Sequence, residues 1–176
     1  MDHWPRMWAR QEARADIARR WWALAGGRPG LAVADVGCGP GFTASLYARW
    51  GASRVLAVDA NASALAFARA RGVPTQVELR QHDITARPLA DDVDVAFVTN
   101  VLHHIRDVEG ALRNVRARTL LVGEFDPEGE GDLGPPLDER IAPDEMRRAM
   151  RAAGWGPSGV RRLDAESYAV VARPGV

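Results

Sequence analysis

Short apolar runs alternate with helical patterns along most of this chain, and this alternation restricts the fold more than any other feature. Four runs are rich in aliphatic residues and stop at glycine or polar residues, as strands buried on both faces of a sheet do. These runs span residues 31–36, 55–59, 93–98 and 119–123. A fifth run, residues 76–81, alternates strictly between polar and apolar residues and predicts a half-exposed edge strand.

Helical patterns lie between and around these strands, in residues 5–25, 42–50, 61–71, 108–115 and 143–153. Asp107 and Asn61 are suited to cap two of the helices, and Gly72 and Gly154 follow the ends of two. Two C-terminal runs, 160–163 and 168–172, are joined by a short polar turn, which predicts antiparallel neighbours. The sequence therefore predicts an α/β fold with a doubly wound, mostly parallel sheet.

The chain is long enough for one domain, which we expect to span residues 1–176. A chain of this mass buries about 70% of its unfolded surface, so its core needs no disulfide or metal. Residues 1–28 form a helical segment, whose tryptophans serve either to pack it on the sheet or to cover a ligand. Residues 126–140, rich in glycine, proline and acids, predict a long loop near the functional site.

Composition excludes several functions. The 23 basic residues balance 23 acidic ones, so we expect no general affinity for nucleic acid or for an anionic membrane. Cys38 is the one cysteine, which leaves no internal disulfide and no thiolate-rich metal site. We find no run approaching the roughly 18 apolar residues of a membrane span and no signal peptide, and we expect a cytoplasmic protein with no metal.

The first strand ends in a glycine-rich loop with the sequence Asp-Val-Gly-Cys-Gly-Pro-Gly, residues 35–41. Such glycines permit a tight turn and close backbone contact with a ligand, and the next helix points its amino end at the same place. A dinucleotide fingerprint requires glycine at position 42, where this chain has Phe42. Asp35 at the mouth of the loop favours a ligand that carries an ammonium and a sulfonium over a pyrophosphate.

Polar residues also follow the other strands, where parallel strands place their ligand. Asp59 is suited to accept hydrogen bonds from both ribose hydroxyls, although it can also simply cap the next helix. Asp83 is suited to an exocyclic amine such as that of adenine, although acids are common in turns. Residues 100–105, with Asn100 and His103, face the same crevice.

On these residues the chain resembles the class I S-adenosylmethionine-dependent methyltransferases of the ubiquinone/menaquinone-biosynthesis type, also grouped as methyltransferase type 11. The resemblance runs from residue 31 to about residue 125 and implies a Rossmann-like sheet of seven strands with the last one inserted antiparallel. It implies S-adenosylmethionine as cofactor and S-adenosylhomocysteine as product. The cofactor-binding residues that it implies are Asp35, Gly37, Cys38, Gly39, Gly41, Asp59, Ala60, Asp83, Ile84 and Asn100.

The resemblance implies methyl transfer to an O, N or C nucleophile of a small-molecule acceptor by in-line displacement. His103 is the candidate general base, with a purely structural role held open. The alternative function is a non-catalytic S-adenosylmethionine-binding module that regulates a partner protein. A DNA methyltransferase is disfavoured because Asn100 is not followed by Pro-Pro-Tyr/Phe. We expect no nucleic acid partner and no membrane span, and we allow for a homodimer.

Overall fold

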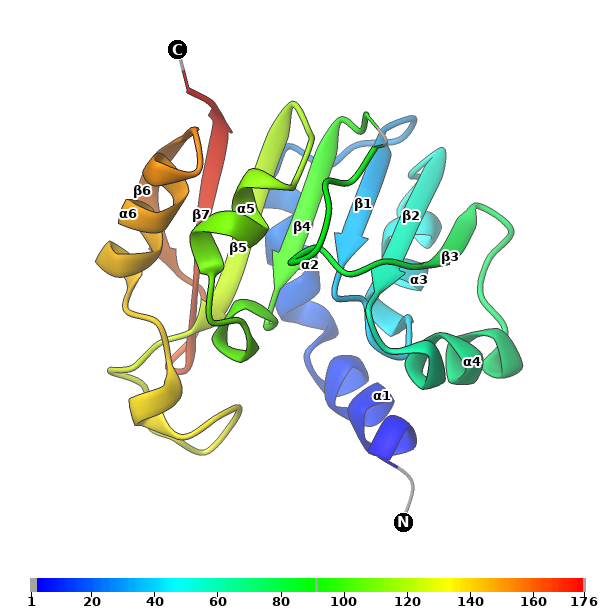
Figure 1. Cartoon of the computed structure of the whole chain (residues 1–176). Helices are drawn as coiled ribbons and strands as arrows, with labels where there is room; N and C mark the ends of the chain where they lie inside the picture. Colours follow the sequence, from blue (N-terminus) through cyan, green and yellow to red (C-terminus); the bar gives the residue numbers. More distant parts are fainter. Residues whose placement is uncertain (1–2, 91, 176) are drawn as a thin grey trace.

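The computed structural model describes residues 3–90 and 92–175 and contains one sheet of seven strands in the order β3-β2-β1-β4-β5-β7-β6 (Figure 1). β7 runs antiparallel to both of its neighbours, and the other pairings in the sheet are parallel. The strands are β1 Ala32–Val36, β2 Arg54–Asp59, β3 Val77–Gln81, β4 Val95–Thr99, β5 Thr119–Phe125, β6 Trp155–Arg162 and β7 Ser167–Pro174. The predicted fold class is confirmed, including β3 at a sheet edge.

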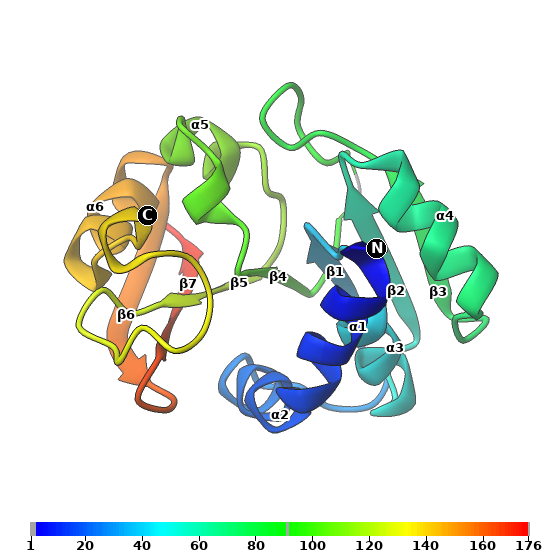
Figure 2. The ribbon, with the colours of Figure 1, turned by 90° about the horizontal axis from the view of Figure 1, so that it is seen from below.

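Helices cover both faces of the sheet (Figure 2). The α-helices are α1 His3–Ala13, α2 Ala15–Leu24, α3 Phe42–Arg49, α4 Ala62–Arg71, α5 Val108–Arg113 and α6 Pro143–Ala152, and the 3-10 helices are η1 Leu102–His104 and η2 Leu137–Glu139. The predicted caps are present: Asn61 accepts from the N–H of Ser63 at 3.0 Å, and Asp107 accepts from that of Gly110 at 2.8 Å. No helix in residues 3–90 and 92–175 has the length and apolar character needed to cross a bilayer.

Two apolar clusters form the core, one on each face of the sheet. Successive residues of a strand point to opposite faces, so Val33 joins the cluster under α2 and α3 while Ala34 joins the cluster under α5 and α6. β1, β2, β4 and β5 are buried along almost their whole length, which explains their continuous apolar sequences. Trp21 and Trp22 of α2 are buried in the first cluster, so these two tryptophans pack the helix on the sheet.

The single N-terminal helix predicted over residues 5–25 is wrong. The helix breaks at Arg14, whose backbone has φ −112° and ψ 26°. Its guanidinium bonds to Asp164 at 3.0 Å, in the turn between β6 and β7, and to the hydroxyl of Ser167, the first residue of β7, at 3.1 Å. These contacts from a distant part of the chain divide the segment into α1 and α2.

The strand predicted over residues 160–163 begins earlier than expected, at Trp155. The indole N–H of Trp155 donates to the carbonyl of Leu112 at 3.0 Å, which anchors the start of β6. The register of β6 is irregular between Pro157 and Val160, which accommodates a proline and glycines. Because these residues are uncommon within strands, the sequence did not indicate the first part of β6.

Candidate functional site

Polar residues singled out in the sequence lie at or after the ends of β1, β2 and β4, which are parallel neighbours and therefore end at the same edge of the sheet (Figure 1). Val36 at the end of β1 pairs with Val58 of β2 on one side and with Val98 of β4 on the other. The strand order reverses at β1, so this edge is the switch point at which α/β sheets bind their ligands. The register brings together the glycine loop, Asp59 and Asn100.

The glycine loop between β1 and α3 depends on a left-handed backbone. The φ angles of Gly37, Gly39 and Gly41 are 75°, 55° and 83°, values that side chains strongly disfavour. The N–H groups of Gly37 and Cys38 donate to the carbonyl of Val58 at 2.8 and 3.0 Å, which fixes the loop against β2. Gly41 is the N-cap residue of α3, so the positive end of that helix opens at the loop.

Asp59, at the end of β2, ties its own turn to the glycine loop. One carboxylate oxygen accepts from the N–H of Gly39 at 2.8 Å, and the other accepts from the N–H of Asn61 at 2.8 Å. The exposed Ala60 between them accepts at its carbonyl from the side chain of Gln81 at 3.1 Å. Each carboxylate oxygen of Asp59 keeps lone-pair capacity for another donor, such as a hydroxyl group.

Asp35 is buried, with 2% of its surface exposed, and does not lie at the mouth of the loop as the sequence suggested. It shares the face of β1 with Val33, which places its side chain beneath α3. The pKa of Asp35 is raised from 3.8 to about 7, mainly by burial and also by the charge of Asp59, while a backbone hydrogen bond from Ala44 lowers it in part. One carboxylate oxygen has no hydrogen-bond partner in the described chain.

We expect Asp35→Asn to stabilise the protein at pH 8 and to change its stability little below pH 4. Between pH 3.8 and about 7 the folded chain holds a proton that the unfolded chain releases. Stability contributed by Asp35 is therefore complete below the unfolded pKa and is lost as pH rises through the folded pKa. The difference amounts to on the order of 4 kcal/mol in unfolding free energy. Urea denaturation between pH 4 and pH 8 measures this difference in unfolding free energy, and Asp138→Asn, at an exposed position, is the control. If the stability of wild type and of Asp35→Asn varies with pH in the same way, the prediction is contradicted.

Three further predicted site residues lie near these elements in different environments. Asp83 is exposed and accepts from the N–H and the hydroxyl of Thr85 at 2.9 and 2.6 Å, bonds that lower its pKa. Ile84 is buried, and its carbonyl accepts from the side chain of Asn114 at 2.8 Å. Cys38 is buried, and burial raises the pKa of its thiol, so this cysteine is a small loop residue and not a reactive thiolate. Contact between Asp83 and an adenine stays a prediction.

The segment after β4 brings Asn100 and His103 to the same edge. Asn100 has φ 55°, an uncommon value for a residue with a side chain, and its N–H donates to the carbonyl of Gly123 at 2.8 Å. Its side-chain oxygen is buried with no hydrogen-bond partner among the described residues. His103 follows in η1, and its ring lies 4.0 Å from that of His104, centroid to centroid. Strain and an unpaired acceptor at one position are typical of a ligand site.

Two residues at this edge were not identified from the sequence. Gln11 of α1 accepts from the N–H of Phe42 at 3.2 Å and donates to the carbonyl of Cys38 at 3.4 Å, so α1 lies over the glycine loop. Nothing in the local sequence points to this long-range contact. Glu124 of β5 bonds to the ring of His103 at 2.7 Å. An acid within a strongly apolar run is the one signal that points to Glu124.

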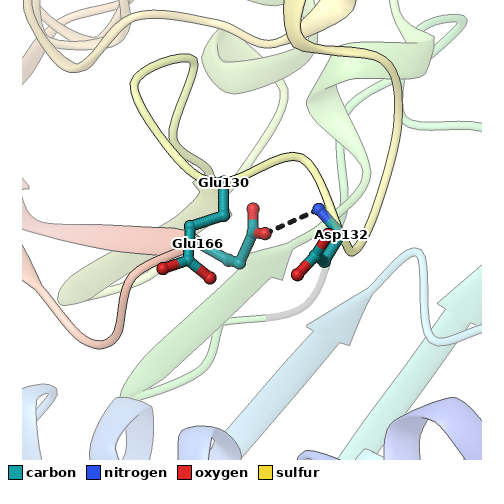
Figure 3. A group of neighbouring side chains, drawn as sticks. All are labelled: Glu130, Asp132 and Glu166. Atoms are coloured by element: carbon teal, nitrogen blue, oxygen red, sulfur yellow. Dashed lines mark hydrogen bonds between the residues drawn. The ribbon is translucent and has the colours of Figure 1, made fainter.

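The loop over residues 126–140 is fastened to the start of β7. The guanidinium of Arg140 bonds to Glu166 at 2.7 Å, to the carbonyl of Asp126 at 2.8 Å and to the carbonyls of Pro135 and Leu133. Figure 3 shows Glu166 beside Glu130 and Asp132, and the dashed line marks the N–H of Asp132 donating to Glu166 at 2.8 Å. Arg140 compensates the charge of Glu166. Because Glu166 bonds to both Arg140 and Asp132, it attaches the loop to the turn before β7.

Comparison with known proteins agrees with this geometry. A family model described as a methyltransferase domain matches residues 34–120. The chain is 43% identical over 76 residues to a trans-aconitate 2-methyltransferase of Azoarcus sp. (strain BH72), covering 43% of this chain and 29% of the relative. It is 29% identical over 153 residues to a ubiquinone biosynthesis O-methyltransferase of Chelativorans sp. (strain BNC1), covering 71% of this chain and 58% of that one.

A solved structure shares the fold. The crystal structure of a SAM-dependent methyltransferase from Aquifex aeolicus superposes with a TM-score of 0.79 at 23% identity, covering 88% of each chain. The chain thus spans less than two thirds of the two curated relatives by sequence, while the fold match extends over most of both structures.

Proposed function

We propose that the chain is a class I S-adenosylmethionine-dependent methyltransferase, which methylates an O, N or C nucleophile of a small-molecule acceptor by in-line displacement. The observation that carries the proposal is the 2.8 Å hydrogen bond from Gly39 to Asp59, which holds a carboxylate beside a glycine loop and a helix amino end. The two relatives, named as a trans-aconitate 2-methyltransferase and a ubiquinone biosynthesis O-methyltransferase, support a small-molecule acceptor.

The polar side chains at this edge of the sheet fit S-adenosylmethionine as cofactor. S-adenosylmethionine is cationic at its sulfonium and ammonium groups and supplies an electrophilic methyl group. Asp35 and Asn100 each hold a side-chain oxygen with no hydrogen-bond partner in the described residues, which suits a ligand that brings positive charge and N–H donors. Because Asp35 is buried, we propose that it acts on the ammonium group mainly through its charge, beneath the loop that binds the methionine part.

We propose the following assignments for the rest of the cofactor. Asp59 and Ala60 hold the ribose, and a carboxylate that accepts from a hydroxyl contributes about 1.5–3 kcal/mol per bond. Asp83 and Ile84 border the adenine. The backbone of Gly37, Cys38, Gly39 and Gly41 forms the wall of the site.

The catalytic contribution of the chain is alignment. Two reactants held in line and shielded from water can gain about 7–11 kcal/mol over the same reaction in solution. Asn100 borders the methyl group in this proposal, and His103 takes the proton of the acceptor. A buried carboxylate bonded to the His103 ring supports a base over a purely structural role. The homodimer and the cytoplasmic location stay predictions from the sequence, to be tested by light scattering and cell fractionation.

Calorimetric titration tests the proposal first. We expect heat on adding S-adenosylmethionine or S-adenosylhomocysteine and none on adding NAD. A screen of small-molecule acceptors, read out as S-adenosylhomocysteine formed, then tests turnover. Binding of NAD without binding of the sulfonium compound contradicts the proposal. Binding of the cofactor without turnover on any acceptor, together with a stable protein partner in a pull-down, favours the regulatory module instead.

A further inference from the structure

Glu124, the penultimate residue of β5, is a buried carboxylate bonded to two backbone N–H groups and to the ring of His103. Its side chain is 1% exposed. One oxygen accepts from the backbone N–H groups of Val101 and Leu102 at 2.9 and 2.7 Å. The other lies 2.7 Å from Nδ1 of His103. The carboxylate therefore binds both the backbone of η1 and the imidazole that η1 presents.

These contacts fix the direction of the bond to His103. One oxygen of Glu124 already accepts from two backbone N–H groups, so the carboxylate acts as an acceptor toward this segment. An ionised carboxylate only accepts, so Nδ1 of His103 carries the hydrogen and donates it. A separation of 2.7 Å is typical of a charge-assisted N–H···O bond. The lone pair of the neutral ring then lies on Nε2.

The surroundings hold the ring of His103 in place. Its side chain is 5% exposed, the ring of His104 lies at 4.0 Å and the ring of Phe125 lies edge-on at 6.1 Å. In the part of the chain that the structure describes, Nε2 makes no hydrogen bond. Other ionisable groups that interact with this pair or its neighbours among the described residues include His104 in η1, Glu139 in η2 and Tyr168 in β7.

We infer that Glu124 is a positioning residue, which holds His103 in the tautomer with hydrogen on Nδ1 and so makes Nε2 the atom that receives the proton of the acceptor. This inference rests on the proposed methyl transfer. As the acceptor atom forms its bond to the methyl carbon, the carbon–sulfur bond breaks and its electron pair stays on sulfur. The acceptor proton passes to Nε2, Glu124 stabilises the resulting imidazolium, and the proton then leaves to water.

Glu124→Gln separates this role from simple anchoring of η1. The amide oxygen of glutamine still accepts from Val101 and Leu102, so the turn is retained. The amide N–H₂ then faces Nδ1 of His103 and requires Nδ1 to be the acceptor, which moves the hydrogen to Nε2. The variant thus keeps the fold and reverses the tautomer. Glu139→Gln is the matched control, because Glu139 lies on the exposed η2 and makes no bond to His103.

The first measurement needs no acceptor. Nitrogen-15 NMR of the histidine rings, assigned with His103→Gln, reports which ring nitrogen carries hydrogen. We expect hydrogen on Nδ1 of His103 in wild type and in Glu139→Gln, and on Nε2 in Glu124→Gln. Hydrogen on Nε2 in wild type overturns the inference, and so does an unchanged tautomer in a folded Glu124→Gln variant. If that variant does not fold, the wild-type spectrum alone decides.

The second measurement uses an acceptor found in the screen. We expect Glu124→Gln to lower kcat by about 100-fold or more, in the range of general-base catalysis, with cofactor affinity within threefold of wild type. In a His103→Gln background the same change lowers kcat by less than twofold, because Glu124 acts through His103. Losses that multiply in the double variant overturn the inference. A tautomer switch in a chain that methylates no acceptor supports the positioning of His103 and contradicts the proposed function.

Discussion

Replacing Asp59 with asparagine weakens binding of S-adenosylmethionine by roughly 10-fold to 100-fold, because hydrogen bonds to a charged carboxylate contribute about 1.5–3 kcal/mol. The substitution removes the charge that the ribose hydroxyls would bond to. It also removes one of the two acceptors that now bind the N–H groups of Gly39 and Asn61. Both losses act on the cofactor site, and calorimetric titration with S-adenosylmethionine measures their sum.

Asp92→Asn is the control for this experiment. Asp92 is exposed and precedes β4, so it lies at the opposite end of the strand from Asn100. We expect cofactor affinity within twofold of wild type in that variant. Unchanged affinity in Asp59→Asn, with an unfolding curve like that of wild type, contradicts the assignment of Asp59 to the ribose.

Gly37→Ala is expected to destabilise the fold by about 2–5 kcal/mol and to abolish cofactor binding. Alanine at φ 75° is strained by about 1–2 kcal/mol, and its Cβ would lie 2.2 Å from a methyl carbon of Val101. Relief of that overlap displaces the segment from Val101 to His103 or the glycine loop. Urea denaturation and cofactor titration measure the two effects.

Gly30→Ala isolates the strain. Gly30 has a φ of 89°, and a Cβ added there meets nothing within 4 Å, so this variant should lose only about 1–2 kcal/mol and keep its cofactor affinity. Adding Val101→Ala to Gly37→Ala removes most of the overlap and is expected to restore part of the stability. Equal losses in the Gly30 and Gly37 variants would show that contact with Val101 has no energetic effect.

The sheet was predictable because its strands are buried on both faces. β1, β2, β4 and β5 need apolar residues at most of their positions, and that requirement leaves a nearly continuous signal in the sequence. β6 needs few such residues, and Gly156 and Pro157 hide its start. The break at Arg14 was not predictable, because it depends on Asp164, which is 150 residues away.

The candidate site was predictable where topology alone positions a residue. Parallel strands end at a common edge, so a motif at the end of β1 and an acid at the end of β2 must be neighbours. The orientation of a side chain depends on the residues that it contacts, and those residues are often far away in the sequence. The burial of Asp35, the contact of Gln11 with the glycine loop and the bond from His103 to Glu124 therefore emerged only with the structure.

The attachment of Arg140 governs how often the loop over residues 126–140 can detach. The side chain of Arg140 is 0% exposed, and it joins Glu166 to three loop carbonyls, so the loop cannot peel away in stages. Opening the loop would break this ion pair and the bonds to the three carbonyls together, so we expect the open state to be rare. An acceptor that enters past this segment would wait for those rare openings, and arrival, not chemistry, would then limit the turnover rate.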